Sequence, residues 1–107
     1  MAEMTREKLL KEIKIRLAAA HNERLRGIVL YGSEVHGTTT PDSDIDLLVL
    51  LDGPVHYGRD LEINLQALHP LSLQIDRRIS AKPVRACEYD NVDCPLYQDV
   101  HREGITI

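Results

Sequence analysis

The chain has 107 residues, and we expect a single domain spanning residues 1–107. Its hydrophobic and charged fractions, 43% and 28%, are those of an ordinary globular protein. A net charge of −4 gives no support to a general nucleic-acid-binding surface, and no apolar stretch approaches the length of a membrane span.

The N-terminal segment predicts an amphipathic helix over residues 5–20, with Thr5 as its N-cap. The same segment has mixed charge and lacks the apolar core of a signal peptide. The two cysteines, Cys87 and Cys94, make neither a disulfide framework nor a four-ligand zinc site. We therefore expect reduced thiols and a cytoplasmic protein.

Two strands are predicted next. A short apolar run, residues 28–31, ends at Gly32 and is typical of a buried strand. A helical turn over residues 33–37 and a loop over residues 37–44 are expected to follow. The continuously apolar run over residues 45–51 predicts a central strand that is covered on both faces.

The second half of the chain predicts a helix over residues 59–68, with Pro70 just after its end. Residues 71–80 then alternate between apolar and polar, which indicates a third strand with Asp76 on its polar face. A last short helix is expected over residues 95–102. This order predicts an α/β fold, an α+β two-layer domain with a small mixed sheet of about three to four strands flanked by helices.

Carboxylates gather around the predicted central strand. Asp44 and Asp46 are two residues apart at its start, so their side chains point the same way. If the third strand is its neighbour, Asp76 joins them. Three crowded carboxylates raise one another's pKa values, and a divalent cation removes that conflict. Hard oxygen ligands suit Mg²⁺, and two such ions can activate a hydroxyl and clamp a leaving oxygen.

Gly32 and Ser33 provide the complementary part of this predicted site. A glycine lets the backbone approach a phosphate closely, and the N–H groups at a helix start point toward an anion. The serine hydroxyl adds a further donor. Together with the carboxylates, this pattern describes a site for a metal-bound nucleoside triphosphate.

The residues also match a known family. Gly32-Ser33, ten intervening residues and Asp44-Ile45-Asp46 resemble the G-S-x10-D-x-D signature of the DNA polymerase β-like nucleotidyltransferase superfamily. The stretch "PDSDIDLLVLL" is similar to the core motif of its small stand-alone members, the minimal nucleotidyltransferases (MNT proteins). The ending "CPLYQDVHREGITI" is similar to theirs as well, so the resemblance covers roughly residues 5–107.

The resemblance implies a role for each matching residue. Gly32 and Ser33 would hold the β- and γ-phosphates of ATP, and Asp44 and Asp46 would bind both Mg²⁺ ions. Asp76 would be the third carboxylate, on the ion that activates the acceptor hydroxyl, and the general base. The reaction would be in-line attack on the α-phosphorus, with transfer of AMP and release of pyrophosphate.

The resemblance also implies a biological setting. Members of this family are commonly encoded beside a HEPN-domain protein, as the antitoxin of a toxin–antitoxin pair. Some silence the toxin by attaching AMP to one of its tyrosines, and others are thought to act by binding. We therefore expect ATP and a HEPN toxin as partners in a hetero-oligomer, with no membrane and no direct nucleic-acid contact.

One position departs from the family pattern. Members often have G-S-x-A-R-G, whereas this chain has His36 where the arginine stands. Imidazole is mostly neutral at pH 7 and cannot form the bidentate phosphate contact of a guanidinium. Either phosphate binding is weaker, or Arg77, Arg78 or Lys82 compensates.

Simpler interpretations and other functions stay open. In the simpler interpretation, Asp44 and Asp46 are a solvated pair at a loop end, and Asp76 is a surface residue paired with Arg78. The protein is alternatively a non-catalytic antitoxin that neutralises its partner by binding. A third alternative is an aminoglycoside-like small-molecule nucleotidyltransferase, against which the short chain argues.

Overall fold

The computed structural model describes residues 5–32, 44–90 and 104–107. Its elements are, in chain order, α1 (Arg6–His21), the 3₁₀ turn η1 (Asn22–Arg24), β1 (Leu25–Tyr31), β2 (Ile45–Leu51), α3 (Tyr57–Ile75), β3 (Ile79–Arg85), α4 (Ala86–Asp90) and β4 (Ile105–Thr106). The predicted turn over residues 33–37, the loop over residues 37–44 up to its last residue, and the late helix over residues 95–102 lie outside the described residues.

The strands form a mixed sheet in the order β3-β2-β1-β4. β1 pairs antiparallel with both β2 and β4, whereas β2 and β3 run parallel. β2 is an interior strand, as its continuous apolar run predicts. The expected α/β class, a small mixed sheet flanked by helices, is confirmed.

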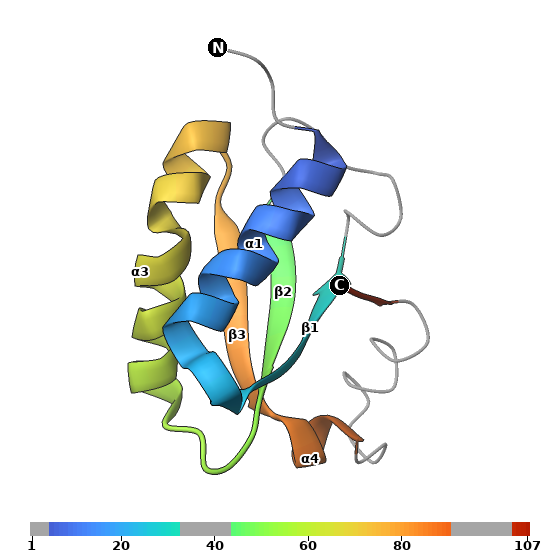
Figure 1. Cartoon of the computed structure of the whole chain (residues 1–107), viewed down its shortest axis with the longest axis vertical. Helices are drawn as coiled ribbons and strands as arrows, with labels where there is room; N and C mark the ends of the chain where they lie inside the picture. The colour runs from blue at the N-terminus through green and yellow to red at the C-terminus, as the bar shows by residue number, and fades with distance from the viewer. Residues whose placement is uncertain (1–4, 33–43, 91–103) are drawn as a thin grey trace.

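α1 and α3 lie side by side across one face of the sheet (Figure 1). The main core lies between these helices and that face. It contains every second residue of β2, and these side chains are fully buried: Ile45, Leu47, Val49 and Leu51. The opposite face carries a smaller cluster that includes Tyr89 of α4; its buried members are Val29, Leu48, Val84 and Tyr89.

α1 confirms the helix predicted at the N-terminus. Thr5 is its N-cap, and the side-chain oxygen of Thr5 accepts a hydrogen bond from the Lys8 N–H at 3.2 Å. The buried positions repeat at helical spacing and face α3 and the sheet: Leu9, Ile13, Leu17 and His21.

α3 is longer than predicted, and the strand predicted over residues 71–80 is wrong. The helix runs through Pro70 to Ile75. Its buried positions, Asp60, Asn64, Leu68 and Leu71, keep helical spacing across the proline. The alternation at residues 71–75 is not a strand pattern, because Leu71 is fully buried whereas Leu73 is 68% exposed. The free energy gained by burying this row of side chains outweighs the cost of the backbone hydrogen bond that Pro70 cannot donate.

Asp76 consequently ends a helix instead of lying within a strand. Its backbone is left-handed, with φ 54°, and the Arg77 N–H donates to the Ser72 carbonyl at 3.2 Å. This is a Schellman-type helix end, where glycine or asparagine is usual and aspartate is tolerated. The third strand begins only at Ile79.

An ion pair between the partly exposed Arg24 and the buried Asp60 fixes the start of α3. Arg24 donates to both carboxylate oxygens of Asp60, at 3.0 and 3.2 Å, and the His56 N–H donates to the same carboxylate at 3.1 Å. The hydrogen bond from Arg24 lowers the pKa of Asp60 despite its burial. A carboxylate at the N-terminus of a helix also suits the helix dipole.

Because the pKa of Asp60 is lowered on folding, its stabilisation is present above the unfolded pKa of about 3.9 and is lost as the pH falls through the folded value. We expect Asp60→Asn to lower the free energy of unfolding by about 2 kcal/mol at pH 7. Urea unfolding at pH 7 and near pH 2 measures this difference, which should shrink at the acid end. The exposed Arg26–Asp52 pair is the control, because Asp52→Asn should cost less than about 0.5 kcal/mol at either pH.

Within the residues that the structure describes, none of the helices has the length and apolar character that a membrane crossing requires.

Candidate active site

Two of the predicted carboxylates lie together at the start of β2. Asp44 directly precedes the strand, and Asp46 pairs in register with Tyr31 of β1. Asp46 is half-buried and Asp44 is exposed. By strand alternation, Asp46 shares a face with Leu48, which belongs to the smaller cluster opposite α1 and α3. The carboxylate pair therefore opens onto the face of the sheet that these two helices leave uncovered.

Gly32 follows β1 immediately and lies against Asp46. Its φ is +81°, a backbone conformation that favours glycine, and a Cβ atom added here would lie 2.7 Å from Asp46 Oδ2. The missing side chain leaves space that the carboxylate uses. The geometry thus brings Gly32 and Asp46 together, as the sequence pattern predicts.

Electrostatics at this point favour binding of a cation. Burial raises the pKa of the Asp46 carboxyl, the negative charge of Asp44 raises it further, and the ammonium group of Lys82 partly offsets both. Burial also raises the pKa of the Tyr31 hydroxyl, and the charge of Asp46 adds to this. Two neighbouring carboxylates in a partly desolvated place gain from a positive charge between them.

The neighbouring strand does not supply the expected third carboxylate. β3 pairs with β2 in the register Asp46↔Ser80 and Leu48↔Lys82. Asp76 lies four residues before Ser80, at the exposed end of α3. No group of three or more acidic, histidine or cysteine side chains within metal-binding reach occurs in the described part of the chain. The predicted placement of Asp76 on this strand is wrong, and its role in a reaction stays a prediction.

The sequence pattern does not indicate that Ser80 and Lys82 lie on the strand next to Asp46. The polar residues 80 and 82 alternate with the buried residues 79 and 81, which is a strand signal. Pro83 obscures it, because proline is rare in strands other than edge strands. β3 is an edge strand, so Pro83 is tolerated there.

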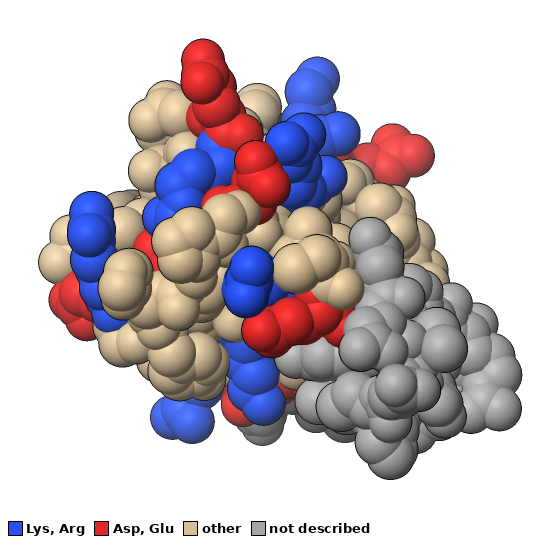
Figure 2. Space-filling view, turned by 90° about the horizontal axis from the view of Figure 1, so that it is seen from below, with Lys and Arg blue, Asp and Glu red and all other residues tan. Residues whose placement is uncertain are grey.

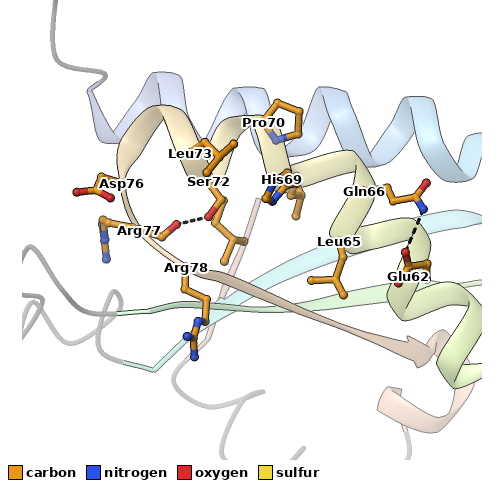
Figure 3. A pocket seen from close by; sticks show the side chains of 12 residues that line it. Glu62, Leu65, Gln66, His69, Pro70, Ser72, Leu73, Asp76, Arg77 and Arg78 are labelled. Carbon is orange, nitrogen blue, oxygen red and sulfur yellow. Dashed lines mark hydrogen bonds between the residues drawn. The ribbon is translucent and has the colours of Figure 1, made fainter.

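A cleft of about 750 Å³ lies elsewhere, along α3 and the start of β3. Figure 3 shows Asp76, Arg77 and Arg78 at one end of it and Gln66 and Glu62 at the other. None of Gly32, Asp44 or Asp46 lines this cleft. Ser33, the other predicted phosphate-binding residue, lies outside the described residues.

Acidic and basic side chains are mixed on the face seen in Figure 2, where they lie next to one another and do not gather by sign. Such a surface produces no large field of one sign on that side. The expected lack of direct nucleic-acid contact stays a prediction.

The mixed sheet, with an aspartate pair at the start of one strand and a glycine at the end of the adjacent strand, is the arrangement that the resemblance in the sequence implies. The family model described as "Nucleotidyltransferase domain" matches residues 7–97. The chain therefore belongs to the nucleotidyltransferase domain family, and the resemblance seen in the sequence is confirmed at this level.

A curated relative is the putative protein adenylyltransferase of Methanocaldococcus jannaschii, 38% identical over 58 residues. That match covers 54% of this chain and 58% of the relative, so the aligned part spans little more than half of each protein.

Solved structures share the fold. A toxin–antitoxin with AMP-PNP has a TM-score of 0.62 at 23% identity, covering 90% of this chain and 70% of that one. A mutant of the toxin–antitoxin MntA-HpeT has a TM-score of 0.59 at 21% identity, covering 98% and 72%. Spectinomycin adenyltransferase AAD(9) from Enterococcus faecialis, with ATP and spectinomycin, has a TM-score of 0.62 at 23% identity, covering 83% and 36%.

Proposed function

We propose that this protein is a Mg²⁺-dependent nucleotidyltransferase that moves AMP from ATP to a hydroxyl group of a partner protein. The observation that carries the proposal is the carboxylate pair, Asp44 and Asp46, beside a glycine that a side chain could not replace without displacing Asp46. Family membership and the relative named as a protein adenylyltransferase support the same reaction class.

The residues fit a divalent cation. Asp44 and Asp46 offer hard oxygen ligands, and their mutual repulsion is the kind that a bound cation relieves. When bound, Mg²⁺ would supply charge neutralisation at the phosphates and would polarise the acceptor oxygen. The two ions expected from the resemblance stay a prediction.

The chain's own contribution is orientation of the nucleotide. The backbone at Gly32 can approach the β- and γ-phosphates closely, and Ser33 adds the donor that the sequence predicts. The acceptor oxygen then forms a bond to the α-phosphorus as the bond from that phosphorus to the bridging oxygen breaks. Pyrophosphate leaves with the electron pair, and the acceptor proton passes to solvent or to a base.

We place the reaction in a toxin–antitoxin pair in the cytoplasm. The partner would be a HEPN-domain toxin, the acceptor one of its tyrosines, and the modification would silence it. The two toxin–antitoxin structures that share the fold support this setting. The spectinomycin enzyme gives less support to a small-molecule acceptor, because this chain covers only 36% of it.

The test is transfer of label from α-labelled ATP, with Mg²⁺, into the protein encoded next to this chain. We expect label on the partner with the natural chain and none with Asp44→Asn, since that variant removes a cation ligand. Mass spectrometry of the labelled partner then identifies the acceptor residue. Asp76→Asn tests the third predicted carboxylate, which stays a candidate only if that variant also loses transfer.

A second function, neutralisation of the partner by binding alone, is favoured by one observation. The β3 residue in register with Asp46 is a serine, not a carboxylate. A stable complex that neutralises the toxin without label, and that Asp44→Asn leaves intact, would support binding and contradict catalysis.

A further inference from the structure

The edge strand β3 presents a serine and a lysine to the carboxylate pair. Because β3 is parallel to β2 and in register with it, Ser80 lies beside Asp46 and Lys82 beside Leu48. Val84, the next residue in the same alternation, packs with Leu48 in the smaller core cluster. The side chains of residues 80, 82 and 84 therefore share the face onto which Asp46 opens.

This pair of residues is poorly suited to a second divalent cation. A hydroxyl is a neutral and weak ligand, and an ammonium group repels a cation at short range. Lys82 lies two residues along β3 from Ser80, on the same face of the sheet as Asp46. Lys82 is exposed, so its four-carbon stem can extend over the site.

We propose that this site holds one divalent cation together with the nucleotide, and that the ammonium group of Lys82 takes the place of a second cation at the phosphates. The inference rests on the proposed function and replaces the second ion expected there with the ammonium group of Lys82. Lysine is a mobile point charge with three donors, and it binds phosphate oxygens in that way at other nucleotide sites. Its charge balances the triphosphate where β3 provides no carboxylate to hold a metal.

The experiment counts bound Mn²⁺ per bound nucleotide, with α,β-methylene-ATP as a probe that cannot transfer AMP. Electron paramagnetic resonance gives the free Mn²⁺, and equilibrium dialysis gives the bound nucleotide. The natural chain should bind one Mn²⁺ per nucleotide. The double variant Ser80→Asp/Lys82→Met, which adds a carboxylate and removes the ammonium group, should bind two.

The single variant Lys82→Met keeps the stem of the side chain and should weaken nucleotide binding about tenfold. Arg85→Met is the matched control, because it removes one positive charge from the last residue of the same strand. There the Arg85 guanidinium lies 3.8 Å from the Glu88 carboxylate. We expect Arg85→Met to change nucleotide binding less than twofold.

Each other outcome has a definite meaning. Two Mn²⁺ ions in the natural chain, or unchanged nucleotide binding by Lys82→Met, would overturn this inference and leave the proposed function standing. A folded double variant that still binds one ion would also count against it. Failure of the natural chain to bind the nucleotide with Mn²⁺ would overturn the proposed function and this inference together.

Discussion

Replacing Gly32 with alanine is expected to reduce AMP transfer about 100-fold while the protein stays folded. The added Cβ atom would lie 2.7 Å from Asp46 Oδ2, so the carboxylate must move. A flexible carboxylate can rotate away at little cost in stability, but it then no longer points where a cation and a phosphate meet. A displacement of about 1 Å in a reacting constellation is enough for an effect of this size.

Gly53 provides a matched control for the backbone effect of this substitution. Its φ is +78°, close to the +81° of Gly32, but an added Cβ atom there meets nothing within 4 Å. Both variants should lose about 1 kcal/mol of stability, because alanine is strained in this conformation. Only Gly32→Ala should lose transfer and Mn²⁺ binding.

Three measurements separate these effects: urea unfolding, Mn²⁺ binding and the rate of label transfer. Equal losses of transfer in the two variants would show that backbone strain alone is responsible. Undiminished transfer and Mn²⁺ binding by Gly32→Ala would remove Asp46 from the site as proposed.

The first half of the fold could be predicted from the sequence because its local signals agree. The capped helix after Thr5, the apolar run before Gly32 and the apolar run from Ile45 to Leu51 each favour one structure. The motif from Gly32 to Asp46 connects the end of β1 with the start of the adjacent strand β2. Pairing of Tyr31 with Asp46 in the sheet then brings Gly32 to the carboxylates.

The second half could not be predicted because its signals conflict. Pro70 indicates a helix end, yet the buried stripe continues through it to Leu71. The stripe is hard to see because two of its four members, Asp60 and Asn64, are polar residues that tertiary partners satisfy. Missing the helix places the predicted strand eight residues too early, so the sequence puts Asp76 beside Asp46 where the structure has Ser80.

The short strand β4 was missed for a different reason. Ile105 and Thr106 pair with Leu30 and Val29, and the Ile107 N–H donates to the Ile28 carbonyl at 2.9 Å. Two paired residues give too weak a periodic signal to predict from sequence. β-branched residues after Gly104 are the signal that was present.

A buried polar chain joins α1, α3 and β3 behind the site. His21 Nε2 lies 2.6 Å from Asn64 Oδ1, and Asn64 Nδ2 donates to the Ala81 carbonyl at 2.9 Å. A carbonyl can only accept, so the Asn64 amide nitrogen faces Ala81 and its oxygen faces His21. His21 Nε2 therefore carries the proton, and its buried Nδ1 atom has no hydrogen-bond partner among the described residues.

Asn64→Leu is expected to lower the free energy of unfolding by about 3 kcal/mol and the melting temperature by roughly 15 °C. Leucine has a similar volume, so the cost comes mainly from leaving the His21 N–H and the Ala81 carbonyl buried without partners. Gln66→Leu on the exposed face of the same helix is the control. It removes an amide that donates to Glu62 at 3.0 Å and should cost less than about 0.5 kcal/mol.

The double variant His21→Leu/Asn64→Leu tests the mechanism of this loss. Removing the donor together with its acceptor leaves only the Ala81 carbonyl unpaired, so the double variant should be more stable than the sum of the two single losses allows. Thermal unfolding of the natural chain, His21→Leu, Asn64→Leu, the double variant and the control Gln66→Leu, followed by circular dichroism, measures this coupling. Additive losses, or an Asn64→Leu cost no larger than that of Gln66→Leu, would show that the chain of hydrogen bonds does not hold α3 against β3. Under the role proposed for Lys82, the coupling would also reach nucleotide binding, because Ala81 lies between Ser80 and Lys82 and its carbonyl is held by Asn64.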